Sequence, residues 1–434
     1  MEYRATQTPN DDTPQTWLPE ANQFAHPFAT WLLELGFDLY LCTVYRRERR
    51  FPQNFRMAPG TMIASNHQRD VDGPMLGNAL VRRHGLRFQS PLPFFATRED
   101  LFQPGILARL TVHWPAPVSA VLGHIPLRWF FSLARTEPMR RTREFTLGDA
   151  LRALVEADLG DRDAASVLNA RGSRETGIVP GGISVRNLLR RREPSLESWW
   201  GLRRLAPSAR AAISADFRAT VQRQLAHFAR RLDQGHCVYF APEGGISTDG
   251  HFARVRAGFY RLNHLARTAP WIQPLALGYD TLAPGRSRVV LGIGEKFRVD
   301  VGASRREFDA SLRRAVLDIV PITPSHLLAR FLLHGPRTFA LDDLTGWLLR
   351  NRDSLAKNGV TLDPLLECVP IDHLAKHRLR WLARKRLVVR DGTGFRNVCP
   401  RDAAPGWHKA ANIIRYLDNG LADAVPEIER LSPC

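Results

Sequence analysis

Short apolar runs alternate with longer helical patterns through most of the chain. Met62-Ile63-Ala64, Val238-Tyr239-Phe240 and Trp271–Leu277 are such runs, and the last of them surrounds a proline. Apolar runs of this length between helical patterns are typical of buried strands joined by helical crossovers. We therefore predict an α/β fold for residues 56–335, with a mainly parallel sheet flanked by helices.

The pattern changes before this region. Residues 1–55 begin with a polar leader and continue with Phe28–Tyr45, an apolar stretch that Glu34 and Asp38 interrupt and that the run RRERR follows. This stretch predicts one or two amphipathic helices. Such helices lie either at a bilayer interface or within a packed helical bundle, and the sequence leaves both open.

Residues 336–434 form a third region, which is mainly helical. From His373 the pattern indicates a helix, a strand at Leu387-Val388-Val389, a turn at Asp391-Gly392-Thr393-Gly394 and a second strand. That order of elements is compatible with a winged-helix-like module.

A long insertion, residues 149–215, interrupts the α/β region. It contains the Gly-rich run GIVPGGIS at 177–184 and the basic run LLRRREP at 188–194, and we judge it too polar to form a core. Loops of this length are uncommon in compact domains unless they serve as lids, binding elements or disordered spacers. We expect one of these three roles.

The charge of the chain narrows the possible partners only in part. A net charge of +18 over 434 residues suits an anionic partner, either a nucleic acid or a membrane surface. However, only five of the 61 basic residues are Lys, and arginines occur throughout the chain, a pattern that codon composition can produce. A basic surface would still attract anionic lipid headgroups.

Cysteines and apolar segments indicate the compartment. The chain has an odd number of cysteines without C-x-x-C spacing: Cys42, Cys237, Cys368, Cys399 and Cys434. This favours a reducing compartment and argues against a disulfide or a zinc site, so we expect no metal and no cofactor.

The polar N-terminus is unlike a signal peptide, and no run reaches the ~18 apolar residues of a spanning helix. We expect a cytoplasmic location.

The clearest chemical signal is Asn66-His67-Gln68-Arg69-Asp70-Val71-Asp72, directly after an expected strand. Imidazole can take a proton from an alcohol near neutral pH, and a carboxylate on its other nitrogen fixes the tautomer and raises its basicity. Gly73-Pro74 mark Asp72 as a helix N-cap, so the residues from His67 to Asp72 should be a loop in which this carboxylate can fold back on the ring. We expect Asp72, rather than Asp70, to be the partner of His67.

Three further segments follow in order. They are Gly123-His124-Ile125-Pro126-Leu127-Arg128, Phe240-Ala241-Pro242-Glu243-Gly244-Gly245-Ile246-Ser247 and Trp271–Leu277. Together with N-H-x4-D at residues 66–72 they resemble the four sequence blocks of the PlsC-type glycerolipid acyltransferase family. The resemblance covers residues 60–280 and implies the α/β fold of glycerol-phosphate acyltransferases.

The resemblance also implies roles for individual residues. His67 and Asp72 would be catalytic, and Arg128 would contact the phosphate of the acceptor through a guanidinium fork that matches phosphate geometry. The implied substrate-binding residues of the third block are Glu243, Gly244, Gly245 and Ser247. Independently of the family, a strand end followed by glycines exposes backbone amides to anions. Glu243 would repel a phosphate and should instead accept hydrogen bonds from acceptor hydroxyls or loop amides.

One position departs from the family pattern. Ile246 stands where the third block usually has Arg, and Glu243–Gly250 resembles the E-G-G-R-S-R-T-G variant of glycerol-3-phosphate acyltransferases with both arginines replaced. Arg254 and Arg256 could supply the charge. Alternatively, the acceptor carries less phosphate than is usual for the family.

The expected function is transfer of a fatty acyl group from acyl-CoA or acyl carrier protein to a hydroxyl of glycerol-3-phosphate or a lysophospholipid, in phospholipid biosynthesis. An anionic membrane surface is an expected partner at the inner face of the cytoplasmic membrane, and the insertion could be a lid or a docking surface for an acidic carrier protein. We do not expect a nucleic-acid partner.

A second class of function nevertheless stays open: a nucleic-acid-binding regulator that uses the C-terminal module, with an acyltransferase-like domain that is not catalytic. The intact pair of His67 and Asp72 counts against it.

Overall fold

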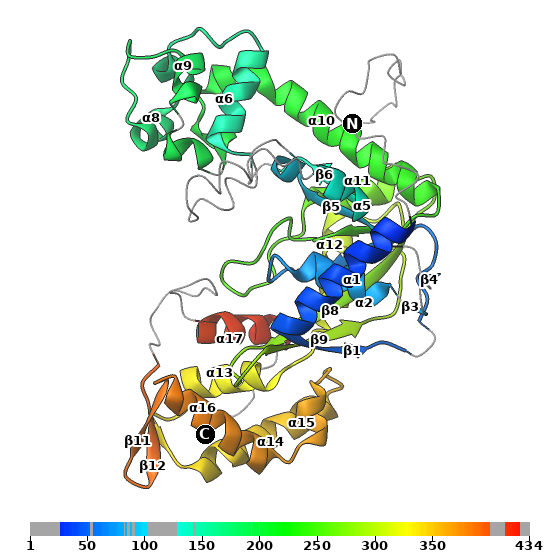
Figure 1. The fold of residues 1–434 in the computed structure, drawn as a ribbon, viewed down its shortest axis with the longest axis vertical. Helices are drawn as coiled ribbons and strands as arrows, with labels where there is room; N and C mark the ends of the chain where they lie inside the picture. Colours follow the sequence, from blue (N-terminus) through cyan, green and yellow to red (C-terminus); the bar gives the residue numbers. More distant parts are fainter. Residues whose placement is uncertain are drawn as a thin grey trace.

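Three parts follow one another along the long axis of the molecule (Figure 1). A helical subdomain lies at one end, an α/β domain in the middle and a second, mainly helical module at the other end. The structure is a computed structural model, and it describes residues 27–52, 55–81, 83–84, 87–88, 92–102, 128–141, 145–191, 193–198, 200–399 and 413–425.

The middle part contains a mixed, mainly parallel sheet of seven strands in the order β1-β9-β8-β2-β7-β5-β6. Among these described strands, only β8 and β9 are antiparallel neighbours. The strand bounds are β1 Tyr45–Arg50, β2 Thr61–Ser65, β5 Phe94–Arg98, β6 Thr136–Met139, β7 Val238–Phe240, β8 Trp271–Asp280 and β9 Ser287–Ile293. The predicted α/β class is therefore confirmed, and all three predicted strands are present.

Helices cover both faces of this sheet because its buried strands are apolar on both sides. Ile63 of β2 faces a core shared with α1 (Pro27–Val44) and α2 (Asp72–Leu80). Met62 and Ala64 face the opposite core, to which α10 (Pro207–Asp233), α11 (Ala257–Leu265) and α12 (Arg305–Leu317) contribute. Smaller elements nearby are the hairpin β3 (Arg83–His84) and β4 (Arg87–Phe88), the 3-10 helix η1 (Glu99–Phe102) and α5 (Arg128–Leu133).

The N-terminal segment extends the sheet instead of standing apart from it. Phe28–Tyr45 forms one helix, α1, up to Val44, and the following RRERR run is β1, which pairs in parallel with β9. β1 thus joins residues on both sides of the boundary that we expected near residue 55. No helix among the described residues is both long and apolar enough to cross a membrane.

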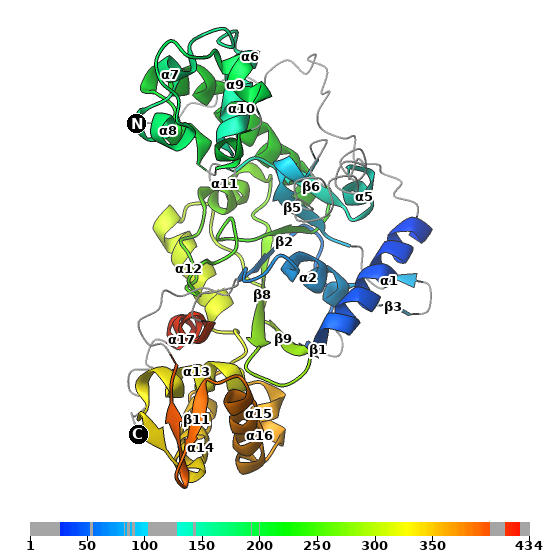
Figure 2. The ribbon, with the colours of Figure 1, turned by 60° about the vertical axis from the view of Figure 1, so that its left-hand side comes forward.

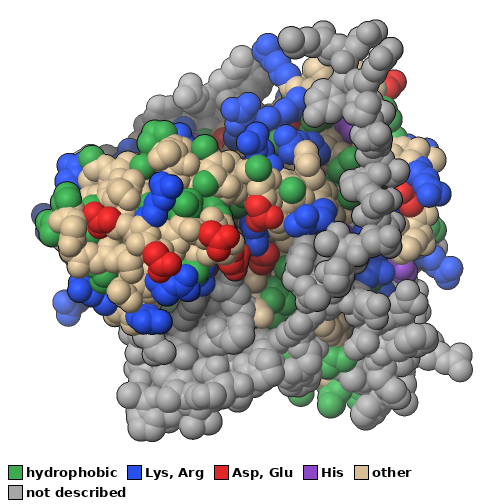
Figure 3. All heavy atoms as spheres, turned by 90° about the horizontal axis from the view of Figure 1, so that it is seen from above, with side chains coloured by type: hydrophobic (Ala, Val, Ile, Leu, Met, Phe, Trp, Pro, Cys, Tyr) green, Lys and Arg blue, Asp and Glu red, His purple; other side chains and the backbone are tan. Residues whose placement is uncertain are grey.

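The insertion is a folded subdomain, so our prediction that it is too polar to form a core was wrong. It comprises α6 (Leu147–Glu156), α7 (Ala164–Val167), α8 (Ala170–Thr176), α9 (Val185–Arg190), η2 (Pro194–Glu197), η3 (Gly201–Arg204) and the start of α10. Apolar residues spaced along these short helices, such as Leu151, Leu188 and Ile213, pack into one core. Arg204 is buried and pairs with Glu175. Basic and acidic side chains are interspersed over the face seen in Figure 3.

The C-terminal module contains the predicted helix, strand, turn and strand. They are α16 (Ile371–Arg384), β11 (Val388–Asp391) and β12 (Gly394–Asn397), with the turn at 392–393. The other described elements are α13 (Pro324–His334), β10 (Thr338–Phe339), α14 (Leu341–Lys357), α15 (Pro364–Cys368) and α17 (Ile413–Ala424). A three-stranded sheet has the order β10-β12-β11. α13, which precedes residue 336, packs into the same core as these elements.

Candidate active site

A cavity of about 910 Å³ lies where β2, β5 and β7 end. These strands are parallel, so the residues that follow them meet at one edge of the sheet. The cavity is lined by His67 after β2, by Ala96, Thr97 and Arg98 at the end of β5, and by Ala241 and Gly245 after β7. The fold thus brings the first and third sequence segments together around one space.

The predicted contact between His67 and Asp72 is present. Nδ1 of His67 lies 3.1 Å from Oδ2 of Asp72, whose side chain is fully buried. Asp70 is exposed and lines the cavity instead. The loop between His67 and α2 is present as predicted, but Val71 is the N-cap and Asp72 is the first residue of the helix. With Nδ1 occupied, Nε2 is the ring nitrogen that remains for a substrate.

Asp72 is surrounded by hydrogen-bond donors. Its Oδ2 accepts from the amides of Gln68 (2.6 Å) and Arg69 (2.8 Å), and its Oδ1 accepts from the hydroxyl of Tyr279. The guanidinium of Arg69 lies 4.1 Å from the centre of the Tyr279 ring. These donors satisfy the buried carboxylate and fix its position within the protein interior. Burial and the neighbouring Asp72 raise the pKa of Tyr279, which keeps its proton available for donation.

Asn66 attaches the loop of His67 to the sheet. Its side-chain amide donates to the carbonyl of Leu277 (2.9 Å) and accepts from the Leu277 amide (2.8 Å). Asn66 thereby bonds to β8 as a strand residue would, although it lies beyond the end of β2. This contact fixes where the chain leaves the sheet, immediately before the imidazole.

Glu243 holds two loops together. One carboxylate oxygen accepts from the amide of His67 and the other from the amide of Ala253, each at 2.9 Å. The side chain is 3 % exposed, and its burial raises the pKa to about 7. Of the two roles expected for Glu243, the structure shows the contact with loop amides.

Gly244 adopts a conformation that favours glycine. Its φ is +69°, and an added Cβ would lie 2.7 Å from Cγ of Arg256, so a side chain would be strained and would collide. Its amide donates to the carbonyl of Ala241 in a turn. Arg256 donates to the Glu243 carbonyl and therefore braces this turn. Neither Arg256 nor Arg254 is among the described residues that line the cavity. The positive charge that we had considered these two arginines to supply is therefore not at the cavity wall.

Ser247 closes a turn beside the cavity. Its hydroxyl lies 2.9 Å from the carbonyl of His251 and accepts the amide of Gly250 at 2.9 Å. Its own amide donates to the His67 carbonyl at 2.9 Å. The substrate contact that the resemblance implied stays a prediction, whereas the contacts seen in the structure order the loop. Ile246, the residue that departs from the family pattern, lines the cavity as well.

The second sequence segment cannot be placed in the site. Residues 123–127 lie outside the described residues, and Arg128 begins α5 with a side chain that the structure does not describe. The described arginines that line the cavity are Arg98 and Arg141. Arg141 follows β6 and donates to the carbonyls of Gly244 (3.1 Å) and Ala96 (3.3 Å).

The other side of the cavity is mainly apolar, although buried Glu34 of α1 also lines the cavity. The residues that form this side come from α1, β5, η1 and α5, and include Phe37, Phe95, Leu101, Phe130 and Phe131. Phe130 contacts both Phe37 and Phe131 through edge-on ring packing. The cavity thus offers an apolar wall to a hydrocarbon group and a polar end beside His67.

Sequence reasoning missed Tyr279, Arg98 and Arg141. Tyr279 comes two residues after the expected strand Trp271–Leu277, and its distance from Asp72 along the chain gives no local signal. Arg141 could have been found from its position after a short strand, but the chain has many arginine pairs. Comparison with models of known protein families and with curated proteins finds no match to this chain, so no family is assigned to it by similarity.

Proposed function

We propose that the chain is an O-acyltransferase that moves a fatty acyl group from a thioester donor to a hydroxyl of a phosphorylated glycerol or lysophospholipid acceptor. The single observation that supports this most is His67, which lines a cavity with an apolar side and two arginines and is paired with buried Asp72 behind it. A base, a place for a hydrocarbon chain and cationic groups are what this reaction needs. The resemblance of four sequence segments to PlsC-type acyltransferases supports the same reaction.

In the proposed reaction, Nε2 of His67 accepts the proton of the acceptor hydroxyl as the oxygen attacks the thioester carbonyl carbon. A carbon–oxygen bond forms, the carbon–sulfur bond breaks, and the thiolate leaves with the proton returned by the imidazolium. Asp72 holds the imidazole and offsets its transient charge. The reaction requires no covalent bond to the protein and no cofactor.

The oxyanion that develops on the thioester carbonyl needs hydrogen-bond donors. The glycines that follow β7, Gly244 and Gly245, are the residues whose backbone amides we consider for this role. The Gly244 amide already donates a hydrogen bond to the carbonyl of Ala241, whereas Gly245 lines the cavity. The Gly245 amide is therefore the candidate that we retain.

The phosphate of the acceptor would meet Arg98 and Arg141, which end or follow neighbouring parallel strands. Two guanidinium groups on one cavity wall suit a phosphate monoester, because both carry positive charge. Nη1 and Nη2 of Arg141 already donate to the carbonyls of Gly244 and Ala96, so the attraction of Arg141 for the phosphate is one of charge. The two arginines offer the charge that the third block lacks at Ile246. This argues for an acceptor that keeps its phosphate.

The test is a thiol-release assay with acyl-CoA and a panel of acceptors, followed by lipid analysis of the product. The proposal expects release that depends on the acceptor, with glycerol-3-phosphate or lysophosphatidate better than glycerol. Thioester hydrolysis that no acceptor accelerates would contradict acyl transfer. Acylated carrier protein should be tested in parallel as the alternative donor.

We further propose that the protein works at an anionic membrane surface on the cytoplasmic side. α1 contributes Phe37 to the cavity, while its outer face exposes Leu32, Leu39, Tyr40 and Val44. An apolar stripe of this kind can insert into the headgroup region and bring the cavity close to lipid substrates. The stripe is the observation that favours a membrane over a purely soluble location.

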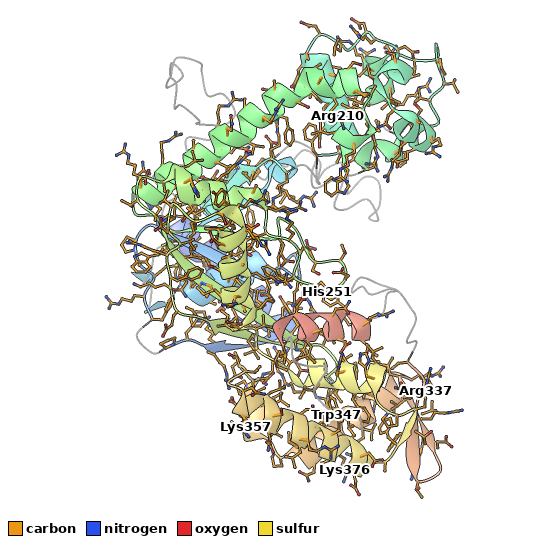
Figure 4. All side chains as sticks on the ribbon, turned by 180° about the vertical axis from the view of Figure 1, so that it is seen from behind. Arg210, His251, Arg337, Trp347, Lys357 and Lys376 are labelled. Atoms are coloured by element: carbon orange, nitrogen blue, oxygen red, sulfur yellow. The ribbon has the colours of Figure 1, made fainter. Side chains whose placement is uncertain are left out.

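A second function remains a candidate: nucleic-acid binding by the C-terminal module. The order α13, β10, α14, α15, α16, β11, β12, with β12 between the other two strands, resembles a winged helix. One face of α16 exposes His373, Lys376, His377, Arg380 and Arg384, and the opposite face is buried. Lys376 lies at the outer end of the module (Figure 4).

This second function can be tested by the fluorescence anisotropy of a labelled DNA duplex at several salt concentrations. If α16 binds phosphates, Lys376→Ala combined with Arg380→Ala and Arg384→Ala should lower the affinity. The slope of log affinity against log salt should become shallower by about 0.9 for each phosphate that the variant no longer neutralises. The matched control replaces three exposed arginines of α10: Arg210, Arg218 and Arg230. Equal losses of affinity in both triple variants would indicate non-specific attraction to a basic protein.

A further inference from the structure

The C-terminal helix α17 lies against the candidate active site. Figures 1 and 2 place it between the α/β domain and the rest of the C-terminal module. It packs with α13 in the module core, and on its other side it meets the loop 246–252. This loop carries the cavity-lining residues Ile246, Ser247 and Thr248.

Two hydrogen bonds connect α17 to the backbone of this loop. The side-chain amide of Asn419 donates to the carbonyl of Asp249 at 2.8 Å, and the amide of Phe252 donates to Oδ2 of Asp423 at 2.6 Å. Both bonds bind main-chain atoms, so they fix the path of the loop and not only its side chains. Figure 4 shows His251, from the same loop, beside α17.

Close packing reinforces these bonds. A Cβ added to Gly250 would lie 2.0 Å from the carbonyl oxygen of Tyr416, so the loop passes directly over the helix backbone. Tyr416 is buried, and the raised pKa of its hydroxyl follows first from that burial and then from the charge of Asp72.

We propose that α17 positions the loop 246–252 for acyl transfer, with Asn419 and Asp423 as positioning residues. The loop acts on the site through the Ser247 amide, which bonds the His67 carbonyl, and through the cavity wall that it forms. The inference rests on the proposed function. It assigns to the C-terminal module a part in the reaction that none of the sequence motifs indicates.

Asp423 allows a sharp test because it has two kinds of partner. Its carboxylate accepts the Phe252 amide, and it also pairs with Arg313 (3.0 Å) and His251 (3.4 Å). Asp423→Asn keeps an oxygen for the Phe252 amide but removes the charge, whereas Asp423→Leu removes both. If loop positioning is the role of Asp423, the Asn variant should rescue what the Leu variant loses.

The matched control is Asp418, on the same helix. It pairs with His334 (2.8 Å) and Arg330 (3.4 Å), and both of these partners belong to α13 and not to the loop. Asp418→Leu therefore weakens the attachment of α17 to the module while leaving the bonds of Asn419 and Asp423 to the loop in place. Thermal unfolding of every variant shows how much general stability each change costs.

The experiment measures kcat/KM for the acceptor and amide hydrogen exchange of residues 246–253 in the full chain. We expect Asp423→Leu to lower kcat/KM about 10-fold and to speed exchange of the Phe252 amide at least as much, while Asp423→Asn stays within about 3-fold of the wild type. Equal effects of Leu and Asn, or an equal loss in Asp418→Leu, would overturn the inference. If the wild type transfers no acyl group, the proposed function fails, and the exchange pattern alone still decides whether α17 holds the loop.

Discussion

At the scale of single residues, the site depends on how Asp72 is held. A buried carboxylate is costly unless donors surround it, and Asp72 has the imidazole, two amides and the Tyr279 hydroxyl. The two amides come from the same loop and follow from its turn. Tyr279 comes from β8, so it links the loop of His67 and Asp72 to the centre of the sheet.

Tyr279→Phe should lower kcat/KM by about 3- to 10-fold, because Asp72 loses a hydrogen bond that holds it against the imidazole of His67. Tyr239→Phe is the matched control, because the Tyr239 hydroxyl is paired with Ser65 and not with Asp72. An equal loss of kcat/KM in the control, or no loss in Tyr279→Phe, would contradict this role.

Glu243 should make stability depend on pH. Burial raises its pKa from 4.5 to about 7, so in this window the folded protein keeps a proton that the unfolded chain releases. Its contribution is complete below pH 4.5 and is lost as the pH rises through about 7, a difference of about 3 kcal/mol. Denaturant unfolding should show that the free energy of unfolding falls more between pH 5 and pH 7.5 for the wild type than for Glu243→Gln. An equal fall in the two proteins would contradict the raised pKa of Glu243.

The sequence allowed the pairing of His67 with Asp72 to be predicted because the signal is local. Gly73-Pro74 indicate where α2 begins, and the resulting loop returns Asp72 to His67. Tyr279 could not be predicted, since its contact depends on the register of β2 against β8. A sequence pattern gives the faces of a strand but not which strand lies beside it.

At the scale of elements, the parallel strands determine which segments meet. β2, β5 and β7 are neighbours, so the chain after each of them reaches the same cavity. The strands themselves were predictable from short apolar runs. Their order was not, and with it the arginines at the ends of β5 and β6 were missed.

Arg141→Gln should weaken acceptor binding more than donor binding. Loss of the positive charge that attracts the phosphate should raise the acceptor KM by about 10-fold or more, with the thioester KM within about 2-fold. Arg140→Gln is the control, because Arg140 pairs with Glu99 and is not among the described residues that line the cavity. Equal increases in both KM values would mean that Arg141 is structural, through its bonds to Gly244 and Ala96.

The insertion shows a limit of composition as a guide to structure. Its polar average led to the prediction of a loop, yet its apolar residues lie at helical spacing within short capped helices. A capping box at Thr146 and Asp149 starts α6. Such caps were readable from the sequence, whereas the packing of these short helices and the start of α10 into one core was not.

At the scale of the whole molecule, some of the basic side chains form ion pairs within the protein. Of the run that follows α1, Arg47 pairs with Asp38, Glu48 with Arg288, and Arg50 with Glu367. These ion pairs attach β1 to α1, to β9 and to the C-terminal module. The run is therefore less available to a membrane than its composition indicates, and the apolar stripe of α1 should carry more of the attachment.

Leu32→Ser combined with Leu39→Ser should reduce co-sedimentation with anionic vesicles by about 10-fold or more, since both side chains are exposed on α1 and would be buried in the headgroup region. Leu349→Ser combined with Val398→Ser, two similarly exposed apolar residues of the C-terminal module, is the control. High salt should weaken wild-type binding further. Absence of binding to any vesicle would point to a soluble, carrier-bound substrate, and binding that resists alkaline carbonate would indicate integral insertion.

The most direct test of the central claim compares acyl transfer by the wild type, His67→Ala, Asp72→Asn and Asp70→Asn, each checked for folding. If His67 is the general base and Asp72 holds it, His67→Ala should lower turnover by at least ~100-fold, Asp72→Asn should be severely impaired, and Asp70→Asn should be mild. Turnover that survives in a folded His67→Ala protein would contradict the proposed chemistry, and the reverse ranking of the two Asp variants would show that the other carboxylate serves His67.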